Sequence, residues 1–313
     1  MTLSRLAVIA TILVAAAACD KKTAGSAPAP GGFDLAKRPE VLFQLFGDRS
    51  DPRMLPVLYF DGPSLKQLEL PAAEWRVFDS LYTRPGNKYT LYADGAPAGI
   101  VRVRQGMWET GEPLYTLPGC QSLLPHAAVT VAGGARDAQG EYFATSRTIA
   151  PPIATDPMAP AEVAREARRG AQVVGASASL STAKLGSLDF RAVALSTGAT
   201  SSQTIIGTFI DPGGGPGMGD REGNGNTAHV FAILDRIGTE YVPTFRLSVN
   251  GPQRTAEFRR YVDHLDLTGD GVSEIVLEGW QFGADSYLII LGFADGAWTE
   301  KFRGRSSWCL DQR

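Results

Sequence analysis

A nine-residue stretch near the carboxyl end of the chain, from Asp266 to Glu274, carries oxygen donors at regular spacing. Oxygen-bearing side chains stand at its first, third, fifth and ninth positions, and the seventh residue can offer its backbone carbonyl. Gly271, at the sixth position, permits the sharp turn that such a loop needs. Hard cations such as calcium take six to eight oxygen ligands at about 2.3–2.6 Å. The predicted ligands are Asp266, Thr268, Asp270, Val272 and Glu274.

The stretch is not an EF-hand, because Leu277 stands where that loop has a bidentate glutamate, and the residues after Glu274 are typical of a strand. With that strand, it resembles the calcium loops of FG-GAP and VCBS-type repeats of integrin-like β-propellers and bacterial surface proteins. The resemblance implies a structural calcium site made by the five residues above. Thr268 departs from the usual Asp or Asn, and its neutral hydroxyl binds a cation more weakly. The alternative is a metal-free turn whose acidic residues face solvent.

The amino terminus predicts export and a lipid anchor. Arg5 precedes an uncharged apolar stretch, residues 6–18, that ends in small residues, as signal peptides do. At 1.5 Å per residue this stretch spans roughly 20 Å, which is short of a bilayer core of about 30 Å. The Ala-Ala-Ala-Cys that ends at Cys19 resembles the lipobox of bacterial lipoproteins. That resemblance implies acylation of Cys19 with fatty chains such as palmitate; the alternative is ordinary cleavage beside an incidental cysteine.

The composition agrees with an exported globular protein. Residues 20–32 contain no hydrophobic side chain larger than alanine, which predicts a disordered tether. The remainder is long enough for one large domain or two of ordinary size. A formal net charge of −3 gives no reason to expect nucleic acid as a partner. We therefore expect an extracytoplasmic protein that attaches to a membrane through its lipid.

Two further cysteines, Cys120 and Cys309, would remain in an oxidising compartment if Cys19 is lipidated. A disulfide between Cys120 and Cys309 is the predicted state, and it would tie the carboxyl-terminal tail to the first half of the fold. The alternative is two buried free thiols.

The elements that must position these residues are predicted to be mainly strands. The chain has 35 glycines and 20 prolines, and short apolar runs separated by turn residues outnumber helix-period stretches. We predict a mainly β fold of two β units with one or two short helices, and not a complete propeller, because the calcium-loop motif occurs once. The predicted strands are Val41–Phe46, Leu55–Phe60, Leu65–Leu70, Tyr89–Ala93, Gly99–Arg104, Asp189–Leu195, Thr204–Ile210, His229–Leu234, Tyr241–Val249, Arg260–Leu267, Ile275–Glu278, Tyr287–Gly292 and Trp298–Phe302.

Proline-rich and glycine-rich segments divide the chain. The four prolines of residues 149–160 predict a linker, followed by a short surface helix over Ala161–Arg169 that Gly170 ends. The predicted organisation is a leader at 1–19, a tether at 20–32, a β-rich domain at 33–150, a linker with the short helix at 151–172, and a second β domain at 173–313. A further helix is predicted over Pro71–Tyr82, where aromatic residues recur at helix spacing.

The sequence carries no familiar catalytic pattern. The chain has three histidines, and neither a metalloprotease motif, nor zinc-spaced cysteines, nor a nucleophile elbow occurs. His264, which flanks the acidic loop, is predicted to be structural. We therefore predict a non-catalytic binding or structural role toward a protein or polysaccharide. The alternative is a hydrolase that acts on envelope polysaccharide or peptide, because active sites assemble in three dimensions. The three histidines are His126, His229 and His264.

Overall fold

The computed structural model describes seven stretches of the chain, namely residues 33–47, 50–70, 74–107, 126–133, 142–212, 225–282 and 286–304. The predicted leader and tether lie outside these residues, and so do Cys19, Cys120 and Cys309. In the described stretches, strands account for 51% and helices for 15%, which confirms the mainly β fold class. These stretches belong to one compact unit, Phe33–Arg313.

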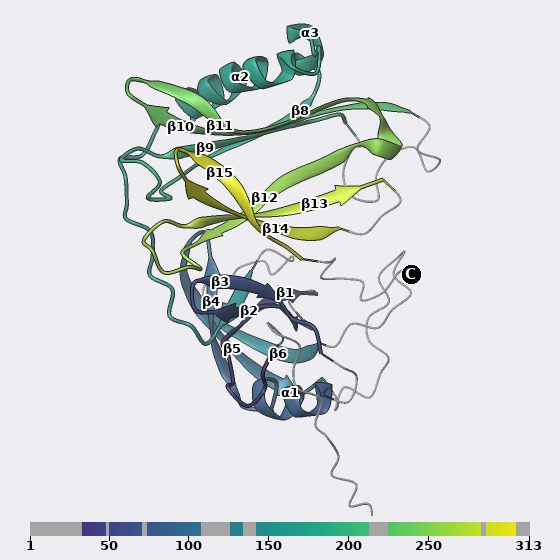
Figure 1. Ribbon diagram of the computed structural model, residues 1–313, viewed down its shortest axis with the longest axis vertical. Coiled ribbons are helices and arrows are strands. Elements are labelled where there is room, and N and C mark those ends of the chain that lie inside the picture. The colour runs from purple at the N-terminus through teal and green to yellow at the C-terminus, as the bar shows by residue number, and fades with distance from the viewer. Residues whose placement is uncertain are drawn as a thin grey trace, which may run out of the picture. The chain divides into compact units, whose positions relative to one another are not determined.

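The first seven strands form one sheet that closes on itself. Their order is β1-β7-β4-β5-β6-β2-β3, and an additional pairing of β1 with β2 closes six of them into a barrel, with β3 appended to its edge (Figure 1). Closure leaves only β3 as a free edge, which removes much of the risk of unwanted strand pairing. The strands are β1 (Val41–Phe46), β2 (Arg53–Asp61), β3 (Ser64–Gln67), β4 (Lys88–Ala93), β5 (Ala96–Gln105), β6 (Ala127–Gly133) and β7 (Phe143–Thr145).

The apolar run of strand β1 is continuous because both faces of the strand are buried. Because successive side chains point to opposite faces of a strand, Phe43 and Leu45 enter the barrel interior, whereas Leu42 and Phe46 join a core on its outer side. Every residue of β1 is buried. Helix α1 (Trp75–Tyr82) adds Phe78 to the same interior core, so the predicted amphipathic helix packs on the barrel.

The remaining eight strands form two antiparallel meanders. Their orders are β11-β10-β9-β8 and β12-β13-β14-β15, so each strand pairs with its neighbours in sequence. The strands are β8 (Asp189–Leu195), β9 (Thr204–Ile210), β10 (Asn226–Ile237), β11 (Glu240–Pro252), β12 (Glu257–Leu265), β13 (Glu274–Gln281), β14 (Tyr287–Ala294) and β15 (Ala297–Arg303), with a short 3-10 helix (Gln253–Thr255) before β12.

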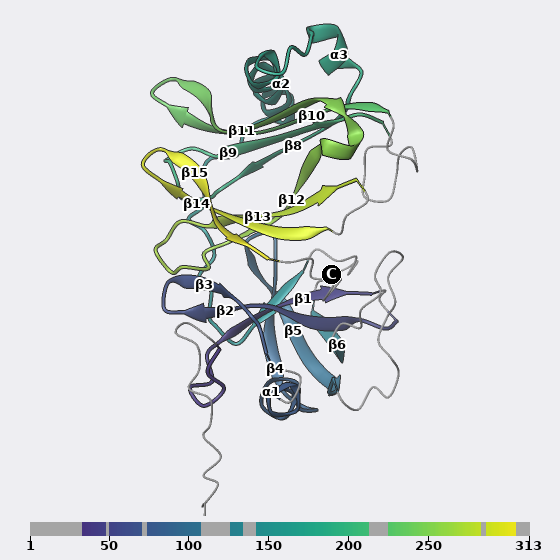
Figure 2. The same cartoon turned by 45° about the vertical axis from the view of Figure 1, so that its right-hand side comes forward.

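The two meanders pack face to face, and helices cover one outer side (Figure 2). On β10, Phe231 and Ile233 contact the β12–β15 sheet, whereas Val230 and Leu234 face helix α2 (Pro160–Ala176), which is followed by α3 (Thr182–Gly186). Burial on both faces accounts for the apolar run of β10, at about 1.5–3 kcal/mol for each large side chain.

Gly170 does not end α2, and the predicted stop there is wrong. The helix continues through Gly170 to Ala176. A methyl group at Gly170 would stand 2.5 Å from a Leu234 methyl carbon on β10. The glycine therefore lets the helix approach the sheet closely, and glycine in a helix interior costs only about 1 kcal/mol relative to alanine.

One core joins strands from the two halves of the described chain. Leu42, Phe46 and Phe143 of the barrel share this core with Val276 and Ile290 of the last meander. The β12–β15 sheet is thus buried on both faces, by the barrel on one side and by the β8–β11 sheet on the other. The predicted linker runs as an extended segment between the barrel strands and α2.

Candidate functional site

The predicted cation loop connects β12 to β13 in this central sheet. Asp266 follows the end of β12 at Leu265, and Glu274 begins β13. Asp266 and Glu274 are buried at the base of the loop, whereas Asp270 is exposed at its rim. Two tightly paired strands therefore fix both ends of the loop.

Asp266 organises the turn through three backbone amides. Its Oδ1 accepts hydrogen bonds from the N–H groups of Gly269, at 2.7 Å, and Asp270, at 3.1 Å. Its Oδ2 accepts one from Gly271 at 3.1 Å. The turn therefore wraps its amides around this carboxylate, as short acidic loops do.

Glu274 closes the loop from the other end. Its Oε2 accepts hydrogen bonds from the N–H groups of Leu267, at 2.8 Å, and Thr268, at 3.2 Å, and its Oε1 accepts one from the Thr268 hydroxyl at 2.9 Å. Burial raises the pKa of Glu274 to about 7, although these hydrogen bonds act in the opposite direction. A nearby cation would favour the ionised form of this carboxyl.

The five predicted ligands lie in one turn, and the structure brings Thr268 and Glu274 into direct contact, with the Thr268 hydroxyl 2.9 Å from Oε1 of Glu274. Within the described stretches, no group of three acidic, histidine or cysteine side chains is arranged to hold a metal ion. Asp266 and Glu274 each accept three hydrogen bonds, whereas a carboxylate offers about four lone-pair sites. The donors retain hard-oxygen chemistry that fits calcium, so the residues present are compatible with the ion.

Neighbouring segments brace the loop. Ser273 donates its N–H to the Thr197 carbonyl at 2.8 Å. The Arg147 guanidinium stacks on Phe60, 4.7 Å from the ring centroid, and lies next to Gly269, where an added methyl group would be 3.6 Å from it. The positive charge of Arg147 beside the loop opposes cation binding, which adds to the weakening expected from Thr268.

The three histidines are all buried in packing contacts. His126 lies edge-on against Phe46, with ring centroids 5.6 Å apart. His264 is hydrogen-bonded to the Tyr261 hydroxyl at 2.8 Å, and burial lowers its pKa to about 4. The predicted structural placement of His264 in a strand agrees with this position in β12.

His229 joins the two meanders. Its Nδ1 is 2.9 Å from the Phe209 carbonyl on β9, and its Nε2 is 3.1 Å from the Arg259 backbone N–H on β12. A carbonyl only accepts and an amide only donates, so these partners assign the proton to Nδ1. Burial lowers the pKa of His229 to about 4, because a charged imidazole would lose both water and the bond to Arg259.

This pKa makes stability depend on pH. Below pH 6.5 the unfolded chain binds a proton at His229 before the folded chain does, so folding stability falls as the pH drops toward 4. Between pH 7.5 and 5 we expect this residue to contribute a loss of about 2 kcal/mol. His264 acts in the same direction, and Glu274 acts in the opposite direction.

The comparison of parent with His229→Gln isolates the His229 contribution, because glutamine can donate and accept without titrating. Urea unfolding at pH 7.5 and at pH 5 measures the free energy of unfolding of both proteins. We expect the stability difference between the two proteins to shift by about 2 kcal/mol in favour of His229→Gln at pH 5. An unchanged difference would contradict the buried neutral imidazole.

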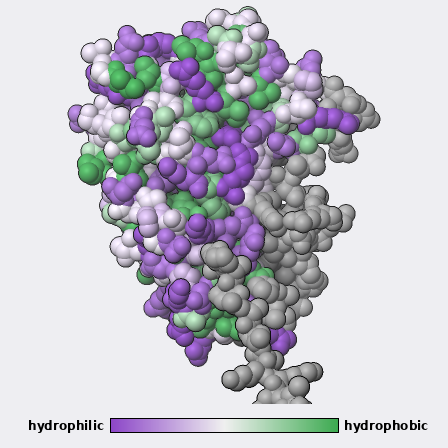
Figure 3. All heavy atoms as spheres, viewed as in Figure 1, coloured by the Kyte–Doolittle hydropathy of each residue, from purple (hydrophilic) through white to green (hydrophobic). Residues whose placement is uncertain are grey.

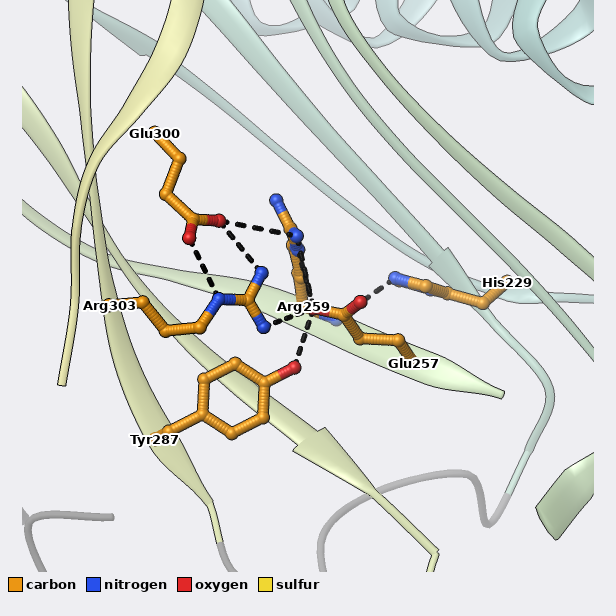
Figure 4. A network of polar contacts seen from close by, with 6 residues as sticks. All are labelled: His229, Glu257, Arg259, Tyr287, Glu300 and Arg303. Carbon is orange, nitrogen blue, oxygen red and sulfur yellow. Dashed lines mark hydrogen bonds and ion pairs between the residues drawn. The ribbon is translucent and has the colours of Figure 1, made fainter. Parts of the chain in front are cut away.

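A polar network that the sequence analysis did not single out lies beside His229 (Figure 4). Arg259 contacts Glu257 at 3.0 Å, and Arg303 contacts Glu300 at 2.7 Å. Burial alone raises the pKa of Glu257, but the Tyr287 hydroxyl and the Arg259 guanidinium hold it below its usual range. Two arginines thus balance two glutamates, and the network ties β12 to β14 and β15.

The described residues on the face shown in Figure 3 form no broad apolar area. Hydrophobic side chains there form small patches among hydrophilic ones. The exposed large hydrophobic residues of the described stretches are dispersed over α1, β5, the linker, α2 and β10, namely Val77, Ile100, Ile153, Val173 and Ile237. Single exposed apolar residues of this kind are ordinary.

The fold and site define a closed six-stranded barrel joined to a two-sheet sandwich with an acidic β12–β13 loop. Comparison with protein-family models, with curated proteins and with solved structures finds no match for this chain. Across the described residues, no helix combines the length and apolar character needed to span a bilayer.

Proposed function

We propose that this chain is an exported, lipid-anchored protein of the bacterial cell envelope with a non-catalytic binding or structural role. The observation that carries the role is the use of its histidines. His126, His229 and His264 are all buried, and the hydrogen bond from the Arg259 N–H to Nε2 of His229 links the two sheets of the sandwich. A histidine that acts as a general acid or base must instead reach a substrate and titrate near the working pH.

The ion pairs of the sandwich support the same role. Arg259 and Glu257 form an ion pair with each other. Arg259 also contacts Glu300, and Glu257 also contacts Arg303 and the Tyr287 hydroxyl, so both charges are neutralised within the fold. Such networks rigidify a surface. A rigid, tethered body suits the presentation of a surface to a partner.

The lipid anchor is tested on protein extracted from membranes. Intact-mass analysis is expected to show a chain that begins at Cys19 and carries fatty acyl groups, because two or more chains are needed for stable attachment. Cys19→Ala is expected to lose the acyl mass and to leave the membrane fraction. An unmodified mature chain that begins at another residue would refute the anchor.

We further propose that the Asp266–Glu274 loop binds calcium weakly and for stability. If bound, calcium would supply positive charge among Asp266, Asp270 and Glu274, where loop amides and the Thr268 hydroxyl now hold the carboxylates. Extracellular calcium modules have dissociation constants near 10⁻⁴–10⁻³ M. At about 1 mM calcium such affinities stabilise the fold by roughly 0.4–1.4 kcal/mol.

A calcium titration of thermal unfolding after chelator treatment tests this proposal. The melting temperature of the parent is expected to rise with calcium and not with the same concentration of magnesium, which demands stricter octahedral geometry. Asp270→Ala is the informative variant, because Asp270 is exposed and only its Oδ1 is engaged, by the Val272 N–H. Its melting temperature is expected not to respond to calcium, whereas Asp295→Ala, in the β14–β15 turn, retains the response of the parent. Equal responses in parent and Asp270→Ala would identify the loop as a metal-free turn.

A further inference from the structure

An open hollow of about 630 Å³ lies at the helix-covered side of the sandwich. Its walls come from four segments: the end of the linker, the first half of α2, the β8–β9 loop and the β10–β11 turn. Its volume lies within the range of small-molecule sites, about 300–1,000 Å³. Unlike most such sites it is lined mainly by polar side chains.

Most of the charges in the walls already neutralise one another. Glu166 accepts from Arg165 on one carboxylate oxygen, at 3.2 Å, and from Arg169 on the other, at 2.9 Å. Arg165 also lies 3.5 Å from Glu162. A charged ligand that engaged Glu166 or its two arginines would have to break these ion pairs. The walls therefore present charges of both signs to any charged ligand.

Several lining side chains keep hydrogen-bonding capacity. Asp156, Ser201 and Arg236 have no side-chain hydrogen bond or ion pair within the part of the chain that the structure describes. They supply an acceptor, a hydroxyl and a fork of donors, respectively. They come from three different segments of the wall. A ligand that reaches all three must both donate and accept hydrogen bonds.

Tyr241 gives the hollow an amphipathic, fixed wall. Its hydroxyl donates to the Met158 sulfur at 3.0 Å, and its carbonyl accepts from Arg169 at 2.7 Å. Aromatic rings held in this way present carbon surface next to polar groups.

We propose that this hollow binds a neutral oligosaccharide. Each sugar hydroxyl both donates and accepts, so it can satisfy Asp156 and Arg236 while the Glu166 pairs stay intact. Tyr241 provides carbon surface for a sugar ring. The proposal rests on the proposed binding role and names its ligand class.

The test measures binding of defined tetrasaccharides by saturation-transfer NMR and calorimetry. The probes are cellotetraose, chitotetraose, maltotetraose and mannotetraose, with tetragalacturonate as the anionic counterpart. At least one neutral probe is expected to bind the parent, and Arg236→Gln and Asp156→Asn are each expected to bind it about tenfold more weakly. Arg191→Gln, on β8 and outside the hollow, is the matched control and is expected to bind like the parent. Melting temperatures of all variants verify that they fold.

Three results would overturn the assignment of this site: no neutral probe binds, only tetragalacturonate binds, or Arg236→Gln and Asp156→Asn bind like the parent. Cleavage of a bound probe would instead refute the non-catalytic role while leaving the site in place. A negative binding result would not bear on the intact-mass measurement. The binding site and the lipid anchor are therefore refuted by different experiments.

Discussion

Replacing Asp235 by alanine is expected to lower the free energy of unfolding by about 4 kcal/mol. This carboxyl on β10 is fully buried and accepts three side-chain hydrogen bonds. They come from Thr204 at 2.6 Å, Thr244 at 2.5 Å and the Trp298 indole N–H at 2.7 Å. Because Trp298 lies on β15, the carboxyl joins the two sheets of the sandwich.

The three donors are not equally dependent on Asp235. Thr204 can bond with Thr197, 2.7 Å away, and Thr244 is 3.2 Å from the Ile233 carbonyl. The buried Trp298 N–H has Asp235 as its acceptor. An unsatisfied buried donor costs about 1–3 kcal/mol, and the space left by the side chain adds to this cost.

Urea unfolding of four variants, Asp235→Ala, Asp235→Asn, Trp298→Phe and the double variant with Asp235→Ala and Trp298→Phe, separates these contributions. Asp235→Asn keeps an acceptor oxygen and the shape of the side chain, so we expect a loss of only about 1–2 kcal/mol. Trp298→Phe removes the indole N–H that Asp235→Ala would leave without an acceptor. Asp235→Ala should therefore lower the free energy of unfolding by less in the Trp298→Phe protein than in the parent, and a double-mutant cycle measures this difference. If the free energy of unfolding of Asp235→Ala lies within about 1 kcal/mol of that of the parent, the buried hydrogen bonds to Asp235 do not determine stability.

The sequence predicts elements well where a local pattern is sufficient. Three predicted strands have the bounds of the observed β1, β8 and β9, namely Val41–Phe46, Asp189–Leu195 and Thr204–Ile210. Turn residues on either side of such apolar runs mark where the strands begin and end. Between the predicted strands Tyr89–Ala93 and Gly99–Arg104, the pair Asp94-Gly95 forms the β4–β5 turn with positive φ angles at both residues, which an Asp-Gly pair tolerates.

The predictions miss what depends on distant partners. Gly170 has the signature of a helix end, but Leu234 on another element decides its role. The barrel could not be predicted, because its closure depends on the pairing of β1 with β2 and on the short β7, which has three residues. The hollow beside α2 likewise has no sequence motif, since four separated segments supply its walls. The position of the acidic turn between two strands was predictable because its residues are contiguous in sequence.

Replacing Gly95 by alanine is expected to cost about 3 kcal/mol of folding free energy. Gly95 lies in the β4–β5 turn with φ of +78°, and a methyl group there would be 2.6 Å from the His264 ring on β12. Its N–H donates to Asp263 at 3.0 Å. The turn of a barrel hairpin is thus fitted against the central sheet, and alanine brings both backbone strain and a steric clash.

Gly62→Ala is the matched control, because Gly62 also has a positive φ, +62°, but no atom lies within 4 Å of an added methyl group. Gly62→Ala should lower the free energy of unfolding only by the cost of backbone strain, about 1 kcal/mol. His264→Ala should rescue part of the Gly95→Ala loss by removing the clash. Similar losses for the two glycine variants, with no rescue, would refute the close contact.

The same variant bears on how the two halves of the chain unfold. The Gly95 turn belongs to residues 33–150 and His264 to residues 173–313, and the core that contains Leu42 and Val276 also spans both. If this shared core couples the halves, Gly95→Ala lowers a single unfolding transition recorded by probes in either half. Two transitions, of which only one responds to Gly95→Ala, would instead support the predicted division at 151–172, with the contact as an interface between separately stable domains.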